Sequence, residues 1–359
     1  MNLKRYGVTA AIVVAGALIL TSCASNETPP SASAAALSGT LNGSGSTAQA
    51  VAQTTWIAGF QTANPGVTVN YAAVGSGAGV TAFQGGSAQY GGSDAALNAD
   101  QRAGTFTECK AGTDALDLPV YISPIDVAFN LSGVTSLKLD APTIAKIFSD
   151  KITKWNDPAI AALNSGATLP ATTITPIHRS DSSGTTNNFT DYLNKADSTD
   201  WTNAANNVFP FKGEAGNGTS GVVAALKAAN GGIAYVDNSA AAGLAVAQIQ
   251  VGTSFVTPSA KGAAATASQS PVADGVPAHD LSLTINRTLT DPTTYPIVLV
   301  SYLIVCQNYA SSADAKLVKA YATYVISAAG QATGAAAAGS APLDSSLTKK
   351  DQTSIATIK

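Results

Sequence analysis

Hydrophobic and polar positions follow a repeating order along most of the chain. Short β-rich runs, such as residues 67–74, end in loops rich in glycine and serine. Segments with helical spacing follow these loops, for example Val51, Trp56 and Phe60 after the loop at 42–47. The order of strand, glycine loop and helix predicts an α/β fold with largely parallel sheets.

The same patterns predict the individual elements. Strands are expected at residues 37–41, 67–74, 90–94, 118–131, 172–177, 232–237 and 295–305. Helices are expected at 48–60, 142–148, 219–229, 239–245 and 313–327, and also after the loops at 75–79 and 178–187. Two long stretches lack apolar periodicity. We interpret residues 24–37 as a flexible tether and residues 258–277 as a surface excursion.

Length and charge narrow the possible classes of protein. A chain of 359 residues is longer than one hydrophobic core usually serves, which favours two domains. Hydrophobic residues make up 45% and charged residues 11%, as expected of a globular protein. The net charge of −3 argues against nucleic acid as a partner, and any anion site must be built from local donors.

The N-terminus has the features of a lipoprotein signal peptide over residues 1–23. Lys4 and Arg5 precede an apolar run that is too short to span a membrane, and Leu20-Thr-Ser-Cys23 is typical of a lipobox. We therefore expect lipidation of Cys23 and anchoring outside the cytoplasmic membrane. The alternative is an ordinary secretory signal followed by an unrelated cysteine.

The two remaining cysteines, Cys109 and Cys306, would then lie in an oxidising compartment. The simplest arrangement pairs them in a disulfide. The alternative is two buried free thiols.

The stretch from His178 to Asn187 has the composition of an anion-binding loop. It contains Arg179, several hydroxyls and Gly184 between a predicted strand and a predicted helix. Such a loop gathers backbone N–H groups, the positive end of a helix dipole and a guanidinium around one point, which suits a tetrahedral oxyanion. Serine-rich loops also serve as ordinary helix caps, and that alternative remains open for this stretch taken alone.

Two further glycine loops, at residues 43–48 and 77–82, match the pattern G-x-G-x-x-A. A dinucleotide site also needs an acidic residue at the end of the following strand, and after the first of these loops that strand end, residues 71–74, contains none. No group of histidines and acids has the spacing of a metal site. We therefore expect neither a nucleotide cofactor nor a metal.

Asp94 is unusual beside loops that donate hydrogen bonds. An ionised carboxylate only accepts hydrogen bonds, so it would favour an anion that carries its own O–H group. Phosphate retains a proton at neutral pH and sulfate does not, so Asp94 could admit the first and reject the second. Asp181 is expected to orient the Arg179 fork. The alternative for Asp94 is a turn or capping role.

Four motifs together resemble the phosphate-specific substrate-binding proteins of ABC importers. They are Gly43-Ser-Gly-Ser-Thr47, Gly75-Ser-Gly-Ala-Gly79, Gly91-Gly-Ser-Asp94 and Arg179-Ser-Asp-Ser-Ser-Gly-Thr185. The resemblance covers residues 38 to 350. It implies a two-lobed Venus-flytrap fold with a ligand cleft between lobes that are joined by two crossover segments. We assign residues 38–119 and 291–359 to lobe I and residues 120–290 to lobe II.

The resemblance also implies a set of ligands and a function. The expected function is binding of inorganic phosphate, without turnover, and its delivery to the permease subunits of an ABC transporter by a monomeric protein anchored to the membrane by lipid. The alternatives are a binding protein for another oxyanion, a phosphatase-like hydrolase on the same scaffold, and a surface adhesion or signalling lipoprotein. The residues expected to contact phosphate are Thr47, Ala48 through its backbone N–H, Ser76, Asp94, Arg179, Ser183, Gly184 and Thr185.

Overall fold

The structure of the protein is a computed structural model that describes residues 36–359. The predicted signal peptide, the lipidation site Cys23 and nearly all of the predicted tether lie outside these residues. None of the helices described is both long and apolar enough to cross a membrane.

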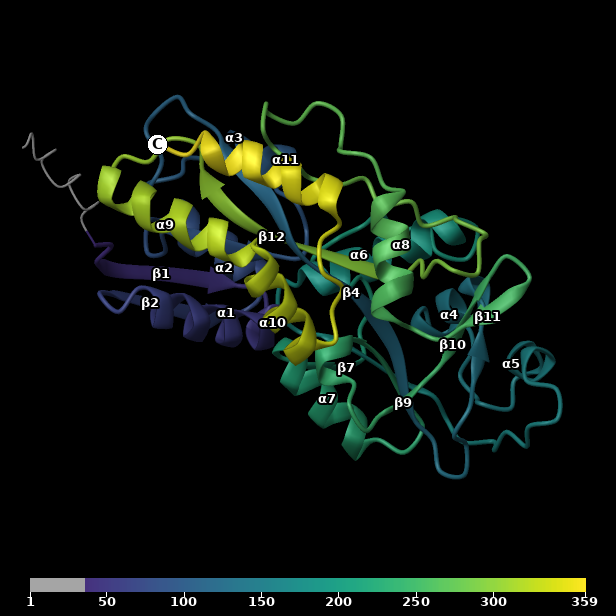
Figure 1. The fold of residues 1–359 in the computed structure, drawn as a ribbon. Helices are drawn as coiled ribbons and strands as arrows, with labels where there is room; N and C mark the ends of the chain where they lie inside the picture. Colours follow the sequence, from purple (N-terminus) through teal and green to yellow (C-terminus); the bar gives the residue numbers. More distant parts are fainter. Residues whose placement is uncertain (1–35) are drawn as a thin grey trace, which may run out of the picture. The chain divides into compact units, whose positions relative to one another are not determined.

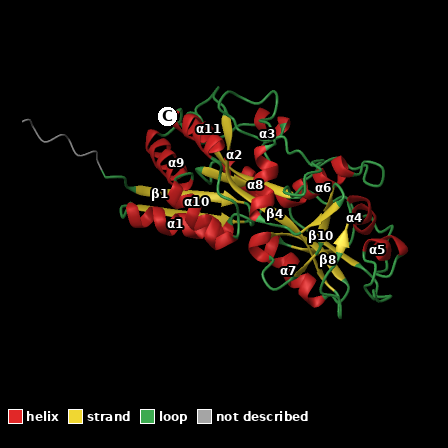
Figure 2. Ribbon diagram, turned by 45° about the vertical axis from the view of Figure 1, so that its right-hand side comes forward, coloured by secondary structure: helices red, strands yellow, loops and turns green. Residues whose placement is uncertain are grey.

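The described chain is built on one mixed sheet with helices on both faces (Figures 1 and 2). Its strands lie in the order β2-β1-β3-β12-β4-β8-β6-β7, and β9 pairs with β4. They are β1 (Gly39–Gly45), β2 (Val67–Ala73), β3 (Tyr90–Ser93), β4 (Ala115–Asn130), β6 (Thr175–Arg179), β7 (Glu214–Gly216), β8 (Gly232–Asp237), β9 (Ala245–Val246) and β12 (Val298–Cys306). A small second sheet contains β5 (Lys138–Leu139), β10 (Gln248–Val251) and β11 (Ser254–Val256).

Most helices come directly after a strand in the chain, as the alternating pattern predicted. Contacts place α2 against β1 and β3, α7 against β6 to β8, and α8 against β4 and β12. The helices are α1 (Ala50–Ala63), α2 (Ser76–Gln84), α3 (Ala99–Ala103), α4 (Ala141–Phe148), α5 (Pro158–Leu163), α6 (Gly184–Ala196), α7 (Gly218–Ala228), α8 (Ala260–Ser268), α9 (Ser312–Val325), α10 (Ala328–Ala338) and α11 (Ser345–Ala356).

The sheet is parallel only toward its two ends. Strands β1, β2 and β3 pair in parallel, as do β6, β7 and β8. In the middle, β12 runs antiparallel to both β3 and β4, and β4 runs antiparallel to β8. The prediction of a largely parallel sheet is therefore correct for the outer strands and wrong for the centre, because β4 and β12 are long strands rather than parts of strand–helix–strand units.

Strand β4 joins the two halves of the sheet. Residues 115–124 pair with β12, and residues 125–130 pair with β8. All of β4 except its last residue is buried. The change of partner at Pro124 and Ile125 falls a few residues after the lobe boundary predicted at 119/120. The lobe ranges themselves stay a prediction.

Two predicted segments differ in the structure. The helix expected at 239–245 is instead a 3₁₀ turn at 238–240 followed by β9. The surface excursion expected at 258–277 contains helix α8, which begins at the cap Ser259. Its buried face consists of Gly262, Ala263, Thr266 and Ala267. These residues are too small and too weakly apolar to produce a clear hydrophobic period, so the sequence pattern missed the helix.

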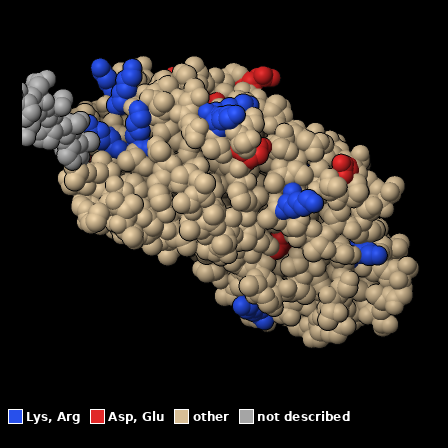
Figure 3. All heavy atoms as spheres, viewed as in Figure 1, with Lys and Arg blue, Asp and Glu red and all other residues tan. Residues whose placement is uncertain are grey.

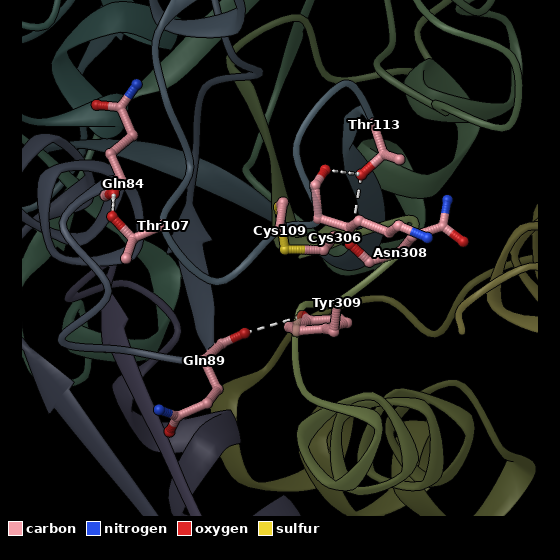
Figure 4. The surroundings of a disulfide bond; sticks show 9 residues. Gln84, Gln89, Thr107, Cys109, Thr113, Cys306, Asn308 and Tyr309 are labelled. Carbon is pink, nitrogen blue, oxygen red and sulfur yellow. Dashed lines mark hydrogen bonds between the residues drawn. A yellow bond between two sulfur atoms is a disulfide. The ribbon is translucent and has the colours of Figure 1, made fainter.

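The predicted disulfide is confirmed. Cys109 and Cys306 are bonded, with their Cα atoms 5.2 Å apart (Figure 4). The bond ties the irregular segment before β4 to the end of β12. Backbone hydrogen bonds from Lys110 to Asn308 and from Ala310 to Glu108 accompany it.

Asp126, on β4, gives rise to the first prediction. Its carboxyl is buried, one of its oxygens has no hydrogen-bond partner among the described residues, and burial together with the charge of Asp237 raises its pKa to about 8. In the unfolded chain this carboxyl loses its proton above about pH 4, whereas in the folded chain it keeps the proton up to about pH 8. The contribution of Asp126 to the free energy of unfolding therefore falls as pH rises from about 4 to 8.

We expect Asp126→Asn to raise the free energy of unfolding at pH 8 by about 1–3 kcal/mol, because the amide does not ionise and so carries no cost of burying a charge, and to have less effect at pH 5, where the wild-type carboxyl is neutral in the folded chain. Urea titrations at both pH values measure this difference. Equal effects at the two values would contradict it.

Candidate functional site

Asp94 follows directly after β3 and lies at the centre of the candidate site. Only 2% of the residue is exposed. Its Oδ1 accepts hydrogen bonds from the hydroxyls of Ser46 and Ser301, the latter at 2.6 Å, and its Oδ2 accepts one from Thr185 at 3.2 Å. Burial raises the pKa of the Asp94 carboxyl, while the hydrogen bonds from Ser301 and Ser46, the charge of Arg179 and the hydrogen bond from Thr185 oppose that rise.

Ser76 begins helix α2 beside Asp94. Its Oγ accepts the backbone N–H of Asp94 at 3.2 Å, which leaves the serine hydrogen free to be donated. The preceding Gly75 has a φ of 100°, and a Cβ there would lie 2.4 Å from Oδ2 of Asp181. A glycine is therefore required for the loop at 75–79 to meet the Arg179 loop this closely.

The loop after β1 supplies Thr47 and Ala48. Strand β1, which lies between β2 and β3, extends to Gly45. Residues 42–45, which were predicted as the start of the loop, therefore belong to this strand. The Oγ1 atom of Thr47 lies 2.8 Å from that of Thr219 at the start of α7. The N–H of Ala48, predicted as an anion donor, here donates to Oγ of Ser46 at 3.0 Å.

Arg179 ends β6 and is 4% exposed. Its Nε donates to Oδ1 of Asp181 at 2.7 Å, and its Nη2 donates to Oδ2 of the same carboxylate. Although burial alone would raise the pKa of Asp181, the Arg179 guanidinium and the N–H of Gly218 hold that pKa below its ordinary value. The predicted pairing of Asp181 with the Arg179 fork is therefore present, and further guanidinium N–H groups remain for an anion.

The N-terminus of α6 carries Ser183, Gly184 and Thr185. Ser183 caps the helix by accepting the N–H of Thr186 at 3.2 Å. The first N–H groups of a helix have no partner within the helix, so they can bind an anion. A Cβ on Gly184 would lie 2.7 Å from the backbone nitrogen of Ala95 and 2.8 Å from Asp94. Glycine is thus required for α6 to begin directly against the Asp94 loop.

The structure brings together the loops that carry all eight residues predicted to contact the ligand. Besides the hydrogen bond from Thr185 to Asp94, the N–H of Gly77 donates to the carbonyl of Ser182 at 3.0 Å. The loops after β1 and β3, the start of α2, and the loop from β6 to α6 therefore meet at one point. The result is a dense group of N–H and O–H donors around one buried acid.

Several residues of this site were not predicted. The carboxylate partners Ser46 and Ser301 are two of them, and Asn188 on α6 donates to the carbonyl of Asp94. Oδ1 of Asn188 in turn accepts a hydrogen bond from Arg287 at 2.7 Å. Ser301 is the only serine or threonine in the apolar run 295–305, which is a signal that sequence inspection could have used.

Surface charge adds little to the site. The face drawn in Figure 3 is largely uncharged, with lysines and arginines gathered toward the upper left and scattered elsewhere. Within residues 36–359, no group of three or more His, Cys, Asp or Glu has a geometry that could hold a metal ion. The local donors described above are therefore the basis of any anion binding here.

Comparison with known proteins identifies the family. The profile of the PBP superfamily domain matches residues 30–329. The phosphate-binding protein PstS 3 of Mycobacterium tuberculosis is 40% identical over 348 residues, which cover 91% of this chain and 92% of that protein. The chain belongs to the PstS family of phosphate-binding proteins. The PstS 2 protein of the same species is 37% identical over 338 residues, with 89% of this chain and 90% of the relative covered.

Solved structures confirm the fold class predicted from the sequence, the two-lobed periplasmic binding-protein fold. A structure described as a high-affinity periplasmic phosphate-binding protein bound with phosphate aligns with a TM-score of 0.72 at 25% identity, over 88% of this chain and 93% of that one. The phosphate-binding protein of Stenotrophomonas maltophilia has the same fold, with a TM-score of 0.62, 18% identity and coverage of 87% and 92%. The PstS relatives are named as binding proteins, in agreement with the prediction that this chain is not an enzyme.

Proposed function

We propose that this chain binds inorganic phosphate outside the cytoplasmic membrane and delivers it to the permease subunits of an ABC transporter. One observation carries the proposal: the buried carboxylate of Asp94 lies among N–H and O–H donors from four loops and within the field of Arg179. A site made only of donors would accept any oxyanion. One acceptor-only group in that site favours an anion that has a hydrogen to donate.

Several of the predicted residues have a defined role in this proposal, whereas the N–H of Ala48 already donates to Ser46. Arg179, fixed by Asp181, supplies the positive charge and N–H donors in a planar fork. The hydroxyls of Ser76 and Ser183 accept backbone N–H groups and therefore keep their own hydrogens for phosphate oxygens. The first amides of α6 donate to the same anion. Asp94 accepts the phosphate O–H.

Binding is proposed to be coupled to closure of the two predicted lobes. Thr47, Ser76 and Asp94 belong to predicted lobe I, whereas Arg179, Ser183 and Thr185 belong to predicted lobe II. A ligand that contacts both groups stabilises the arrangement in which they meet, and so shifts an open–closed equilibrium without chemical turnover. The hydrogen bonds from Thr185 to Asp94 and from Gly77 to Ser182 would be made in that closed state.

The lipid anchor at Cys23, the permease partner and the monomeric state belong to the same proposal. Anchoring would keep a monomeric protein close to its transporter. Globomycin, which inhibits lipoprotein signal peptidase, tests the anchor: treated cells are expected to retain the precursor mass.

Native mass spectrometry of protein purified without added phosphate tests the proposed ligand directly. A tight site is expected to retain a phosphate adduct, which dialysis under mild denaturation removes. Titration of the stripped protein is then followed through the fluorescence of the buried Trp56, Trp155 and Trp201, with sulfate and molybdate as competitors. Saturation by sulfate in preference to phosphate would instead support the alternative of another oxyanion.

Asp94→Asn is expected to relax selectivity. The amide retains an oxygen for the hydroxyls of Ser46 and Ser301, but it can turn its NH₂ group toward the ligand and donate to sulfate. We expect phosphate affinity to fall a few-fold and sulfate affinity to rise by about tenfold or more, the scale of one hydrogen bond to a charged group. Competition titrations measure both, and sulfate exclusion as strong as in the wild type would contradict the role of Asp94.

A further inference from the structure

Two serines donate to Asp94, and their neighbours determine where each serine hydrogen points. Oγ of Ser46 accepts the backbone N–H groups of Ala48 at 3.0 Å and Gln49 at 3.3 Å. A hydroxyl has one hydrogen, and the lone pairs of this one are occupied. The hydrogen of Ser46 is therefore directed to Oδ1 of Asp94.

Ser301, in the middle of β12, is constrained in the same way. The side-chain nitrogen of Gln49 donates to Oγ of Ser301 at 2.6 Å and to the carbonyl of Tyr302 at 3.0 Å. A carbonyl can only accept, which fixes the nitrogen end of the amide on this side. Ser301 must then accept from Gln49, and its own hydrogen goes to Asp94 Oδ1 at 2.6 Å in preference to the more distant carbonyl of Ser93 at 3.2 Å.

Further buried side chains determine the orientation of the Gln49 amide. The nitrogen of Gln53 donates to Oε1 of Gln49 at 2.9 Å, and the hydroxyl of Tyr321 donates to Oε1 of Gln53 at 2.7 Å. All of these residues are buried. Every hydrogen bond from Tyr321 to Asp94 is therefore donated in the same direction, through helix α1, and it ends on the carboxylate.

The two oxygens of Asp94 consequently differ. Oδ1 receives two O–H hydrogens and has no place for a proton of its own, whereas Oδ2 receives only the hydrogen bond from Thr185 at 3.2 Å. Oδ2 is the oxygen on the side of α6, where the predicted anion donors lie. It can accept a hydrogen from a ligand.

We propose that Ser46 and Ser301 determine the selectivity of the site, by holding Asp94 as an acceptor that distinguishes a protonated oxyanion from an unprotonated one. This inference rests on the proposed function. The serines are positioning residues, because they act on the ligand through Asp94. Other groups that act electrostatically with the Asp94 carboxyl are Arg179, Tyr71 and Asp237, and none of them is changed in the test below.

The test uses Ser301→Ala in the full chain and compares dissociation constants for phosphate and sulfate between pH 5.5 and 8.5. Without the Ser301 hydrogen, Asp94 is more easily protonated and can donate to sulfate. We expect the preference for phosphate over sulfate to fall at least about tenfold, the scale of one hydrogen bond to a charged group. Sulfate affinity should increase as pH falls, because the protonated acid is the form that donates.

Two further variants separate this role from a general loosening of the sheet. Ser301→Thr keeps the hydroxyl and is expected to keep the discrimination. Ser123→Ala removes another buried hydroxyl, from the neighbouring strand β4, where it donates to the carbonyl of Pro124 at 3.2 Å. We expect wild-type discrimination from this variant. Relaxed discrimination in both alanine variants, or unchanged discrimination in Ser301→Ala at every pH, would overturn the inference.

A measurement on the wild-type chain keeps the inference testable if Ser301→Ala does not fold. With ¹³C-labelled aspartate, the Asp94 carboxyl resonance, assigned by its loss in Asp94→Asn, is expected at the carboxylate position at pH 7. A resonance at the position of the neutral acid would overturn the inference. Failure of the wild type to bind phosphate at all would refute the proposed function itself, and the titration of the unmodified chain reveals that outcome separately.

Discussion

Replacing Arg179 with alanine is expected to weaken phosphate binding by about 2–5 kcal/mol, which corresponds to roughly thirty-fold to several thousand-fold. The guanidinium is buried and paired with Asp181, so its removal eliminates the main positive charge and leaves the Asp181 carboxylate facing the anion. A half-buried carboxylate without its arginine partner repels phosphate, in addition to the loss of the hydrogen bonds from Arg179.

Isothermal titration at constant ionic strength measures this loss. Lys212→Ala is the matched control, because it removes one positive charge from an exposed position and is expected to leave affinity nearly unchanged. Arg179→Lys should fall between the two, since lysine retains the charge but not the planar fork. An Arg179→Ala variant that binds phosphate like the Lys212→Ala control would contradict the proposed site.

Replacing both Cys109 and Cys306 with alanine is expected to lower the free energy of unfolding by about 2–4 kcal/mol. The bond closes a loop with a sequence separation of 197 residues, so its loss gives the unfolded chain much more freedom. The irregular segment before β4 would also lose its covalent link to β12. Guanidinium titration of both proteins measures the difference.

Reduction of the wild type with dithiothreitol should reproduce the effect of the double variant and should add nothing to the variant itself. Phosphate affinity at 25 °C is expected to change little, because the bond joins elements away from the Asp94 loop. Equal unfolding midpoints for the oxidised wild type and the double variant would show that the disulfide contributes nothing to stability.

The sequence was most informative where short motifs determine local geometry. Ser76 begins a helix, Arg179 ends a strand, and Thr47 and Asp94 follow strands closely, so the glycine loops around them were visible without a structure. The pairing of Asp181 with Arg179 could be predicted because a single residue separates them and a carboxylate suits a guanidinium. These are contacts over short distances in the chain.

The sequence was least informative where distant segments meet. Ser301 lies 207 residues from Asp94, and nothing in the local pattern of either residue indicates their contact. Gln49 is the N-cap residue of α1 and Gln53 lies on the buried face of this helix, and apolar periodicity cannot identify such buried polar residues. Helix α8 was missed because it packs through small residues, and the central sheet was mispredicted because β12 comes from the end of the chain.

The place of β12 in the sheet has a consequence for how the chain acquires its structure after export. This strand, from residues 298–306, lies between β3 and β4, which do not pair with each other. A chain that leaves the membrane N-terminus first therefore exposes two unsatisfied sheet edges until its last sixty or so residues have been translocated. Because β12 pairs with strands that are distant in the sequence, we expect this part of the sheet to form slowly.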